Sequence, residues 1–226
     1  MKSKLLFSII FMFIFFQLFS ISEFACSFLF INTSASNSAF GTEAGTADIR
    51  HLSASSINNN PAKLGAFRGI SCDYTNIKYG SGRFTSSNLA IGWNGIGFSL
   101  PMINGKSEFN TRLDYKSCDF HDEYGTVIDT YKPYETNHKF SVGFDLLRII
   151  NKYFTNYQIE RYNLYLGYSH SFINSRILPK SISFNGKSSY GEVGLLFEYL
   201  PKERINRFIK NELTFGLNMV NPTKSQ

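Results

Sequence analysis

The chain has 226 residues and a formal net charge of +6, and it contains 23 Phe and 13 Tyr but a single Trp. This composition is typical of an aromatic-rich β-protein and argues against a disordered chain or a helical repeat. The basic residues are dispersed, without a long run or a basic helix face, so we expect no nucleic-acid partner. Three cysteines are too few for a disulfide scaffold.

The N-terminus has the features of a secretory signal peptide. Basic Met1-Lys2-Ser3-Lys4 precedes an apolar run that ends at Phe19, and small residues follow at 20–22. The apolar run is about 15 residues long, whereas a membrane-spanning helix needs roughly 20. We therefore predict that residues 1–22 are removed on export. The alternatives are a membrane anchor and a lipoprotein whose mature chain begins at Cys26.

Residues 23–66 have the composition of an arm rather than of a folding unit. Ser, Asn, Ala, Gly and Thr dominate from Ile31 to Ser56, so this part needs another surface to pack against. The polar stretch SINNNPAKLG follows at 56–65 and contains strong turn-forming residues. Within it, Pro61 fixes its own φ angle and favours an extended Asn60.

From residue 67 to residue 226 the chain alternates between apolar and polar residues with a period of two, which predicts about eight β-strands. Asn94-Gly95 is a tight-hairpin dipeptide between two of these runs. A polar loop is expected from His121 to Asn137, and a loop or a short helix from Ile149 to Glu160. The strongest predicted strands are Lys139–Leu146, Arg161–Phe172 and Asn211–Met219, and the weaker ones are Ile70–Thr75, Asn88–Trp93, Gly95–Leu100, Phe109–Lys116 and Gly191–Tyr199.

Alternation of this kind is compatible with a soluble sandwich, whose apolar faces form a core, and with a membrane barrel, whose apolar face contacts lipid. The export signal and the small residues on the polar faces, such as Gly143 and Gly167, favour the barrel. Strand-like runs of about eight to twelve residues also suit a tilted spanning strand. Aromatic residues flank the runs, as in the interfacial girdles of barrels: Tyr79, Phe84, Tyr115, Tyr124, Tyr153, Tyr162 and Tyr199.

The N-terminal run resembles that of outer-membrane barrels similar to the long-chain fatty-acid transporters (FadL-like) and to the secretion-associated PorV-like barrels. The matching residues are small residues at Gly45 and Ala47, then Ala54-Ser55, then the closing motif of Asn60, Pro61, Ala62 and Leu64. His51-Leu52-Ser53 departs from the pattern, since these families more often have acidic residues there. The resemblance implies an antiparallel transmembrane β-barrel with a hatch-like arm in its mouth.

The end of the chain departs from the same pattern. The sequence finishes with Asn221-Pro222 and four further residues, whereas barrels of this kind usually finish with a strand that ends in an aromatic residue. The families that it resembles are also longer. We therefore expect an incomplete barrel that lacks its closing strands.

No motif predicts an enzyme, a metal site or a cofactor. The densest group of potential ligands, Cys118–Glu123, is interpreted as a charged hairpin loop, and the glycines at 92–97 as a hairpin. We predict a bacterial outer-membrane protein that contacts outer-membrane lipid and binds or passively transports hydrophobic small molecules. The alternatives are a PorV-like barrel that scaffolds secretion-system proteins and a soluble secreted β-sandwich.

Overall fold

The computed structural model of the chain describes residues 52–80, 82–101, 111–153, 161–176, 186–200 and 213–222. The predicted signal peptide, together with Gly45 and Ala47 of the predicted arm, lies outside these ranges. No helix within them combines the length and the apolar character that a membrane crossing requires.

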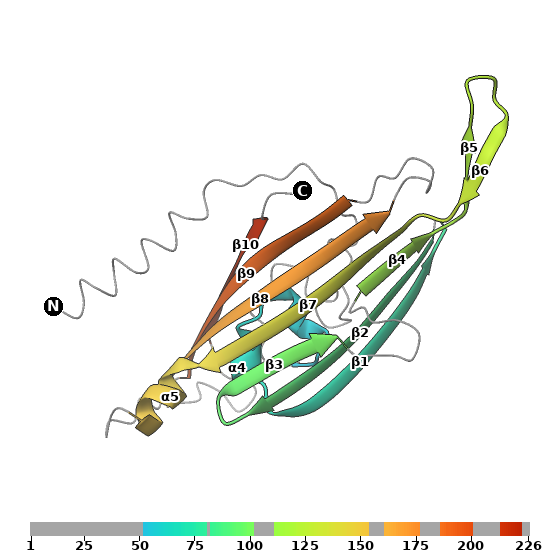
Figure 1. Cartoon of the computed structure of the whole chain (residues 1–226). Helices are drawn as coiled ribbons and strands as arrows, with labels where there is room; N and C mark the ends of the chain where they lie inside the picture. The colour runs from blue at the N-terminus through green and yellow to red at the C-terminus, as the bar shows by residue number, and fades with distance from the viewer. Residues whose placement is uncertain are drawn as a thin grey trace.

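Most of the described residues belong to one large antiparallel sheet, which confirms the predicted all-β fold class. The strands follow the order β1-β2-β3-β7-β8-β9-β10, and β4 pairs with β2 and β7. Figure 1 shows them side by side, with β1 and β10 at the two edges. The strands of this sheet are β1 (Gly69–Tyr79), β2 (Gly82–Trp93), β3 (Ile96–Pro101), β4 (Thr111–Tyr115), β7 (Tyr134–Asp145), β8 (Tyr162–Arg176), β9 (Gly186–Tyr199) and β10 (Leu213–Pro222).

Strands β3 and β4 occupy a single position in the sheet, because both pair with β2 on one side and with β7 on the other. Residues Ser86 and Asn88 of β2 are two positions apart, yet their partners are Thr111 and Pro101 respectively. The two predicted strands therefore share one position in the sheet, between β2 and β7.

The predicted polar loop from His121 to Asn137 is wrong for most of its length. Strands β5 (Cys118–His121) and β6 (Val127–Tyr131) form a separate antiparallel hairpin, and β7 begins shortly afterwards. The turn of this hairpin is fixed by Asp122, whose Oδ1 accepts hydrogen bonds from the backbone N–H groups of Tyr124 and Thr126. In Figure 1 the hairpin projects beyond the end of the large sheet.

The opposite end of the sheet carries two predicted features. Asn94 and Gly95 have φ angles of 52° and 90°, which confirms the tight hairpin between β2 and β3. Helix α5 (Leu146–Tyr153) follows β7 directly, so Leu146, which was predicted as the end of the strand, is the first residue of the helix. Asp145 begins this helix, because its Oδ1 accepts a hydrogen bond from the Arg148 N–H.

One face of the large sheet, here called the outer face, exposes its apolar side chains. In β3, for example, Ile96, Phe98 and Leu100 are exposed, whereas the alternating Gly97 and Ser99 are buried. The predicted alternation is thus confirmed, and its apolar side is the uncovered one. Exposed apolar residues of the outer face are Ile70, Tyr74, Ile91, Trp93, Ile96, Phe98, Leu100, Phe140, Tyr162, Leu166, Tyr168, Phe172, Leu213, Phe215 and Leu217.

The opposite face, here called the inner face, buries polar and charged side chains. It carries the short elements η2 (Ser56–Asn59) and α4 (Lys63–Ala66), which with their flanking residues form the N-terminal segment, residues 52–68. Phe84 and Tyr115, which were predicted as outer girdle residues, point to this face because they alternate with outer residues of their strands. Buried polar residues of the inner face include Ser86, Asn88, Ser99, Glu135, Asn137, Lys139, Ser141, Asp145, Ser169, Ser171, Glu192 and Glu198.

Candidate functional site

Six glycines form a continuous row across the sheet, from β1 to β9. Each glycine is the direct register partner of the next. The row therefore runs across the strands, from one strand to its neighbour. Neither the row nor its continuity was predicted, although Gly143 and Gly167 were noted as small residues on polar faces. The row is Gly69, Gly92, Gly97, Gly143, Gly167 and Gly194.

The backbone of the N-terminal segment lies directly on this row. A Cβ atom placed on Gly143 would be 2.6 Å from both the backbone N of Gly65 and the Cβ of Leu64, which is closer than real Cβ atoms approach. Equivalent atoms on the neighbouring glycines would meet atoms of Asn60, Pro61, Leu64 and Phe67. The five glycines of the row from Gly92 to Gly194 are therefore the seat of the segment, and contact at this distance requires residues without side chains. Gly69, at the end of the row, has no atom within 4 Å of an added Cβ.

The predicted motif residues meet at this seat. Asn60, Pro61, Ala62 and Leu64 are all buried against the sheet. The Asn60 side chain closes the turn, because its Oδ1 accepts a hydrogen bond from the Ala62 N–H at 3.0 Å. Its Nδ2 donates to the Leu195 carbonyl of β9 at 3.3 Å. The side chain that shapes the turn therefore also attaches it to the sheet.

The first part of the segment is attached to the edge strand β1. The Ala54 N–H donates to the Ser71 Oγ at 3.2 Å, and the Ser55 N–H donates to the Asp73 Oδ2 at 2.6 Å. Ala54 also packs in a small apolar cluster on the inner face, together with Leu64, Phe67 and Ala90. The segment thus reaches from β1 to β9 across the inner face.

A buried ion pair beside the glycine row also binds the segment. The Lys139 Nζ lies 2.6 Å from the Glu192 Oε2, and both side chains are almost fully buried. The same ammonium donates to the Asn58 carbonyl at 3.1 Å, while Ser169 donates to Glu192 at 2.9 Å. Sequence reasoning missed this pair because the two residues are far apart in the chain, and only their strand register brings them together.

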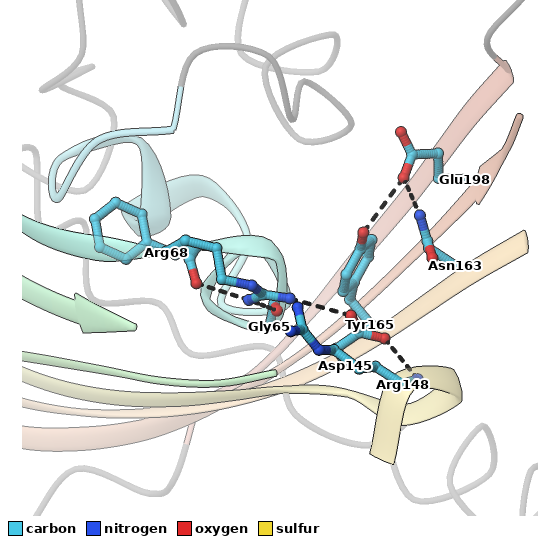
Figure 2. A network of polar contacts seen from close by, with 8 residues as sticks. Gly65, Arg68, Asp145, Arg148, Asn163, Tyr165 and Glu198 are labelled. Carbon is cyan, nitrogen blue, oxygen red and sulfur yellow. Dashed lines mark hydrogen bonds and ion pairs between the residues drawn. The ribbon is translucent and has the colours of Figure 1, made fainter. Parts of the chain in front are cut away.

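A second polar network holds the other end of the segment (Figure 2). The Arg68 guanidinium donates to the carbonyls of Gly65 and Phe67 at 2.6 and 2.7 Å, and it lies 3.2 Å from the Asp145 carboxylate. Since Asp145 also begins helix α5, this network joins the N-terminal segment to the end of β7.

Beside that network, Glu198 accepts two hydrogen bonds from β8. Asn163 donates through its Nδ2 at 2.7 Å and Tyr165 through its hydroxyl at 3.3 Å (Figure 2). The carboxylate is buried, and its two donors lie on the neighbouring strand of the same face. These bonds stabilise the inner face close to the seat of the segment.

Further along the strands, the inner face becomes partly apolar. A group of four buried side chains, here called the distal cluster, consists of Phe84, Leu113, Ile173 and Tyr190. A carboxylate, Glu135, borders it and accepts hydrogen bonds from the Tyr115 hydroxyl at 3.0 Å and the Ser175 hydroxyl at 3.2 Å. No sequence signal marked this cluster, because its members come from four strands.

The predicted group of potential ligands at Cys118–Glu123 lies in the projecting β5–β6 hairpin, away from the seat of the segment. Its Asp119 accepts a hydrogen bond from Thr130 across the hairpin, and Asp122 fixes the turn. Among the described residues no group of three or more His, Cys, Asp or Glu side chains is arranged to hold a metal ion.

Comparison with protein families, with curated proteins and with solved structures gives no significant match to this chain. The function of the site therefore has to be inferred from its own geometry.

Proposed function

We propose that the chain forms the wall of an outer-membrane β-barrel that binds or passively conducts hydrophobic small molecules, with the N-terminal segment as a plug. The observation that carries the proposal is the inverted distribution of side chains, in which apolar residues are exposed and polar residues are buried. In water this arrangement is unfavourable, because each exposed large apolar side chain loses about 1.5–3 kcal/mol of burial free energy. In a bilayer the same arrangement is the stable one.

The apolar band of the outer face has the height of a bilayer core. On β8 it extends over the eleven residues from Tyr162 to Phe172, and their ten steps on a strand tilted by about 40° rise by about 25 Å. At one end Tyr162 stacks on Tyr199, with ring centroids 5.2 Å apart. Beyond the other end the outer positions are largely charged: Lys78, Arg83, Arg112, Asp114, Arg176 and Lys187. Both ends therefore have the polarity expected of a membrane boundary.

A soluble β-sandwich is the competing interpretation. A sandwich would cover the apolar faces with a second sheet, whereas the described part of the chain has one large sheet and leaves side chains such as Phe98 and Phe215 half exposed or more. The buried ion pair of Lys139 and Glu192 supports the barrel, because polar and charged side chains are typical of a barrel interior and unusual in a sandwich core. We therefore favour the membrane barrel.

In this proposal the N-terminal segment acts as the gate. It corresponds to the hatch that the family resemblance implies. It is attached mainly through polar groups and backbone contacts, so it can be released without the strands being unpaired. A hydrophobic molecule would pass the segment when it leaves the glycine row, and no energy source would be needed. This is a mechanism of passive passage.

The projecting hairpin favours a second candidate, a PorV-like scaffold for secreted or secretion-system proteins. Its tip and one strand expose Tyr124, Val127 and Ile128, with exposed fractions of 84%, 49% and 61%. Exposed apolar residues on a projecting element are typical of a protein-binding surface. Deletion of residues 118–131 should abolish co-purification of such a partner, and retention of the partner would contradict this candidate.

The single tryptophan provides a direct test of the membrane assignment. Trp93 is on the outer face, at the end of β2 beside the Asn94-Gly95 turn, and is 80% exposed. In vesicles we expect its fluorescence to be quenched by brominated lipid and protected from aqueous iodide. A Trp93→Phe/Tyr124→Trp variant, which moves the tryptophan to the hairpin tip, should show the opposite behaviour. Iodide quenching of Trp93 in folded, vesicle-bound protein would refute the proposal.

A further inference from the structure

The outer face carries a belt of basic residues just beyond one end of the apolar band, the end opposite to Tyr162. Strand register arranges the belt in two neighbouring rows that cross the sheet from β1 towards β9. The first row is Asn76, Thr85, Arg112, Thr136, Asn174 and Lys187, and the second is Lys78, Arg83, Asp114, Tyr134 and Arg176. The basic residues of the belt thus outnumber its single acidic residue.

Most of this positive charge is not neutralised within the described part of the chain. The one carboxylate of the belt, Asp114, accepts two hydrogen bonds from Arg112, at 2.8 and 3.0 Å. Arg83 donates through its Nε to the uncharged side chain of Asn76 at 2.9 Å. The other cations, and Arg83 with them, form no ion pair with a described carboxylate: Lys78, Arg176 and Lys187.

The belt lies where lipid headgroups would lie under the proposed function. Phe172, the last residue of the apolar band on β8, is 50% exposed, and Asn174 and Arg176 follow it on the same face. Lys187 of β9 is exposed and is the register partner of Asn174. A lipid whose acyl chains lie on the apolar band would therefore have its headgroup beside the basic side chains, whose stems can follow apolar surface while their charged ends stay in the polar region.

The strands carry no comparable belt at the other end of the apolar band, within the described residues. The outer positions there are aromatic or aliphatic, for example Trp93, Ile96, Tyr162, Tyr199 and Leu213. The two leaflets of a bilayer would therefore meet strand surfaces of different charge. Only the leaflet at the belt would be in contact with a row of guanidinium and ammonium groups.

We infer that the belt binds lipids with an anionic phosphate headgroup and selects them over zwitterionic lipids. A phosphate offers several oxygen acceptors, which a guanidinium can bind in a bidentate way and an ammonium as a point charge. The inference rests on the proposed function, because it requires the outer face to contact lipid. It adds a selectivity for the headgroup that the apolar band cannot supply.

A tryptophan placed beside the belt reports which lipid lies there. The variant Trp93→Phe/Phe172→Trp is reconstituted in phosphatidylcholine vesicles, and quenching by dibrominated phosphatidic acid is compared with quenching by dibrominated phosphatidylcholine that has the same chains. We expect the phosphatidic acid to bind about five- to 25-fold more tightly at this position, the effect of one or two basic residues at a membrane surface. The unmodified chain, whose Trp93 reports on the opposite end, should show a smaller preference.

Two charge variants in the Phe172→Trp reporter chain separate the belt from the net charge of the protein. Arg176→Gln/Lys187→Gln removes two cations next to the reporter and should abolish most of the preference. Lys152→Gln/Arg161→Gln is the matched control, because it removes the same charge from helix α5 and from the residue before β8, at the opposite end. This control should keep the preference, and an equal loss in both variants would overturn the inference.

Other outcomes separate the inference from the proposed function. Equal binding of the two lipids at the Phe172→Trp reporter, or an equal preference at both reporters, would overturn the inference and leave the proposed function standing. Displacement of phosphatidic acid by inorganic phosphate, but not by sodium sulfate of the same ionic strength, would assign the belt to free phosphate and would also overturn it. If neither brominated lipid quenches the reporter, the outer face does not contact lipid, and both the inference and the proposed function fail.

Discussion

Replacement of Gly194 by alanine is predicted to release the N-terminal segment from the sheet. The new Cβ would be 2.8 Å from the Pro61 Cδ and 2.9 Å from the Ala62 N, and it would collide with the Asn60 side chain. Overpacking of this kind costs about 1–3 kcal/mol when the neighbouring backbone has to move. At about 1.4 kcal/mol for each factor of ten, the released population should rise by roughly 5- to 140-fold.

Trypsin cleavage after Lys63 measures this population, because Lys63 is fully buried in the seated segment. When opening and closing are fast, the cleavage rate follows the open fraction, so it should rise by the same factor. Cleavage after the exposed Lys116 serves as an internal reference.

Gly186→Ala is the matched control, because Gly186 lies on the same strand and face and its new Cβ would approach no closer than 3.7 Å to Ser175. The claim that the segment packs on the glycine row would be refuted if the cleavage rate after Lys63 were unchanged in Gly194→Ala. An equal increase of that rate in both variants would refute it as well.

Two further predictions concern the outer face and the buried ion pair. Leu166→Arg, near the middle of the apolar band, should lower the free energy of unfolding of the vesicle-embedded protein in urea by about 2–4 kcal/mol. Leu213→Arg, in the register row of Tyr162 and Tyr199, should lower it by only about 0–1 kcal/mol. Equal losses in the two variants would contradict the membrane assignment. Lys139→Met should cost about 3–5 kcal/mol because it leaves Glu192 buried without its cation. Lys139→Met/Glu192→Leu should recover most of that loss, and a double variant as unstable as the single one would show that the pair is not the cause.

The strands could be predicted where their two faces differ in polarity. In β7 the alternation of Lys139, Ser141 and Gly143 with apolar residues marked the last part of the strand correctly. The first part was missed, since Glu135, Thr136 and Asn137 are polar on both faces and leave no period of two. The outer residue of these three, Thr136, is nevertheless 1% exposed, so burial there does not follow hydrophobicity.

The site could be predicted only in its local part. Turn chemistry identified Asn60 and Pro61 as an elbow before the first strand, and the structure places both against the sheet. The glycine row was not predictable, because each glycine is ordinary within its own strand. The row exists only because the strand register places Gly143 opposite both Gly97 and Gly167.

The inverted faces also explain why the N-terminal segment is attached as it is. If the apolar side contacts lipid, as we propose, few apolar side chains are left on the inner face with which to hold the N-terminal segment. Besides small apolar clusters such as that of Leu64, Phe67 and Ala90, the segment is held by backbone contacts at glycines and by hydrogen bonds to polar side chains, which are the contacts that Asn60 and Lys139 make. Such contacts are specific in position but weaker than a packed core. An inverted sheet is therefore suited to a plug that can leave its seat while the strands stay paired.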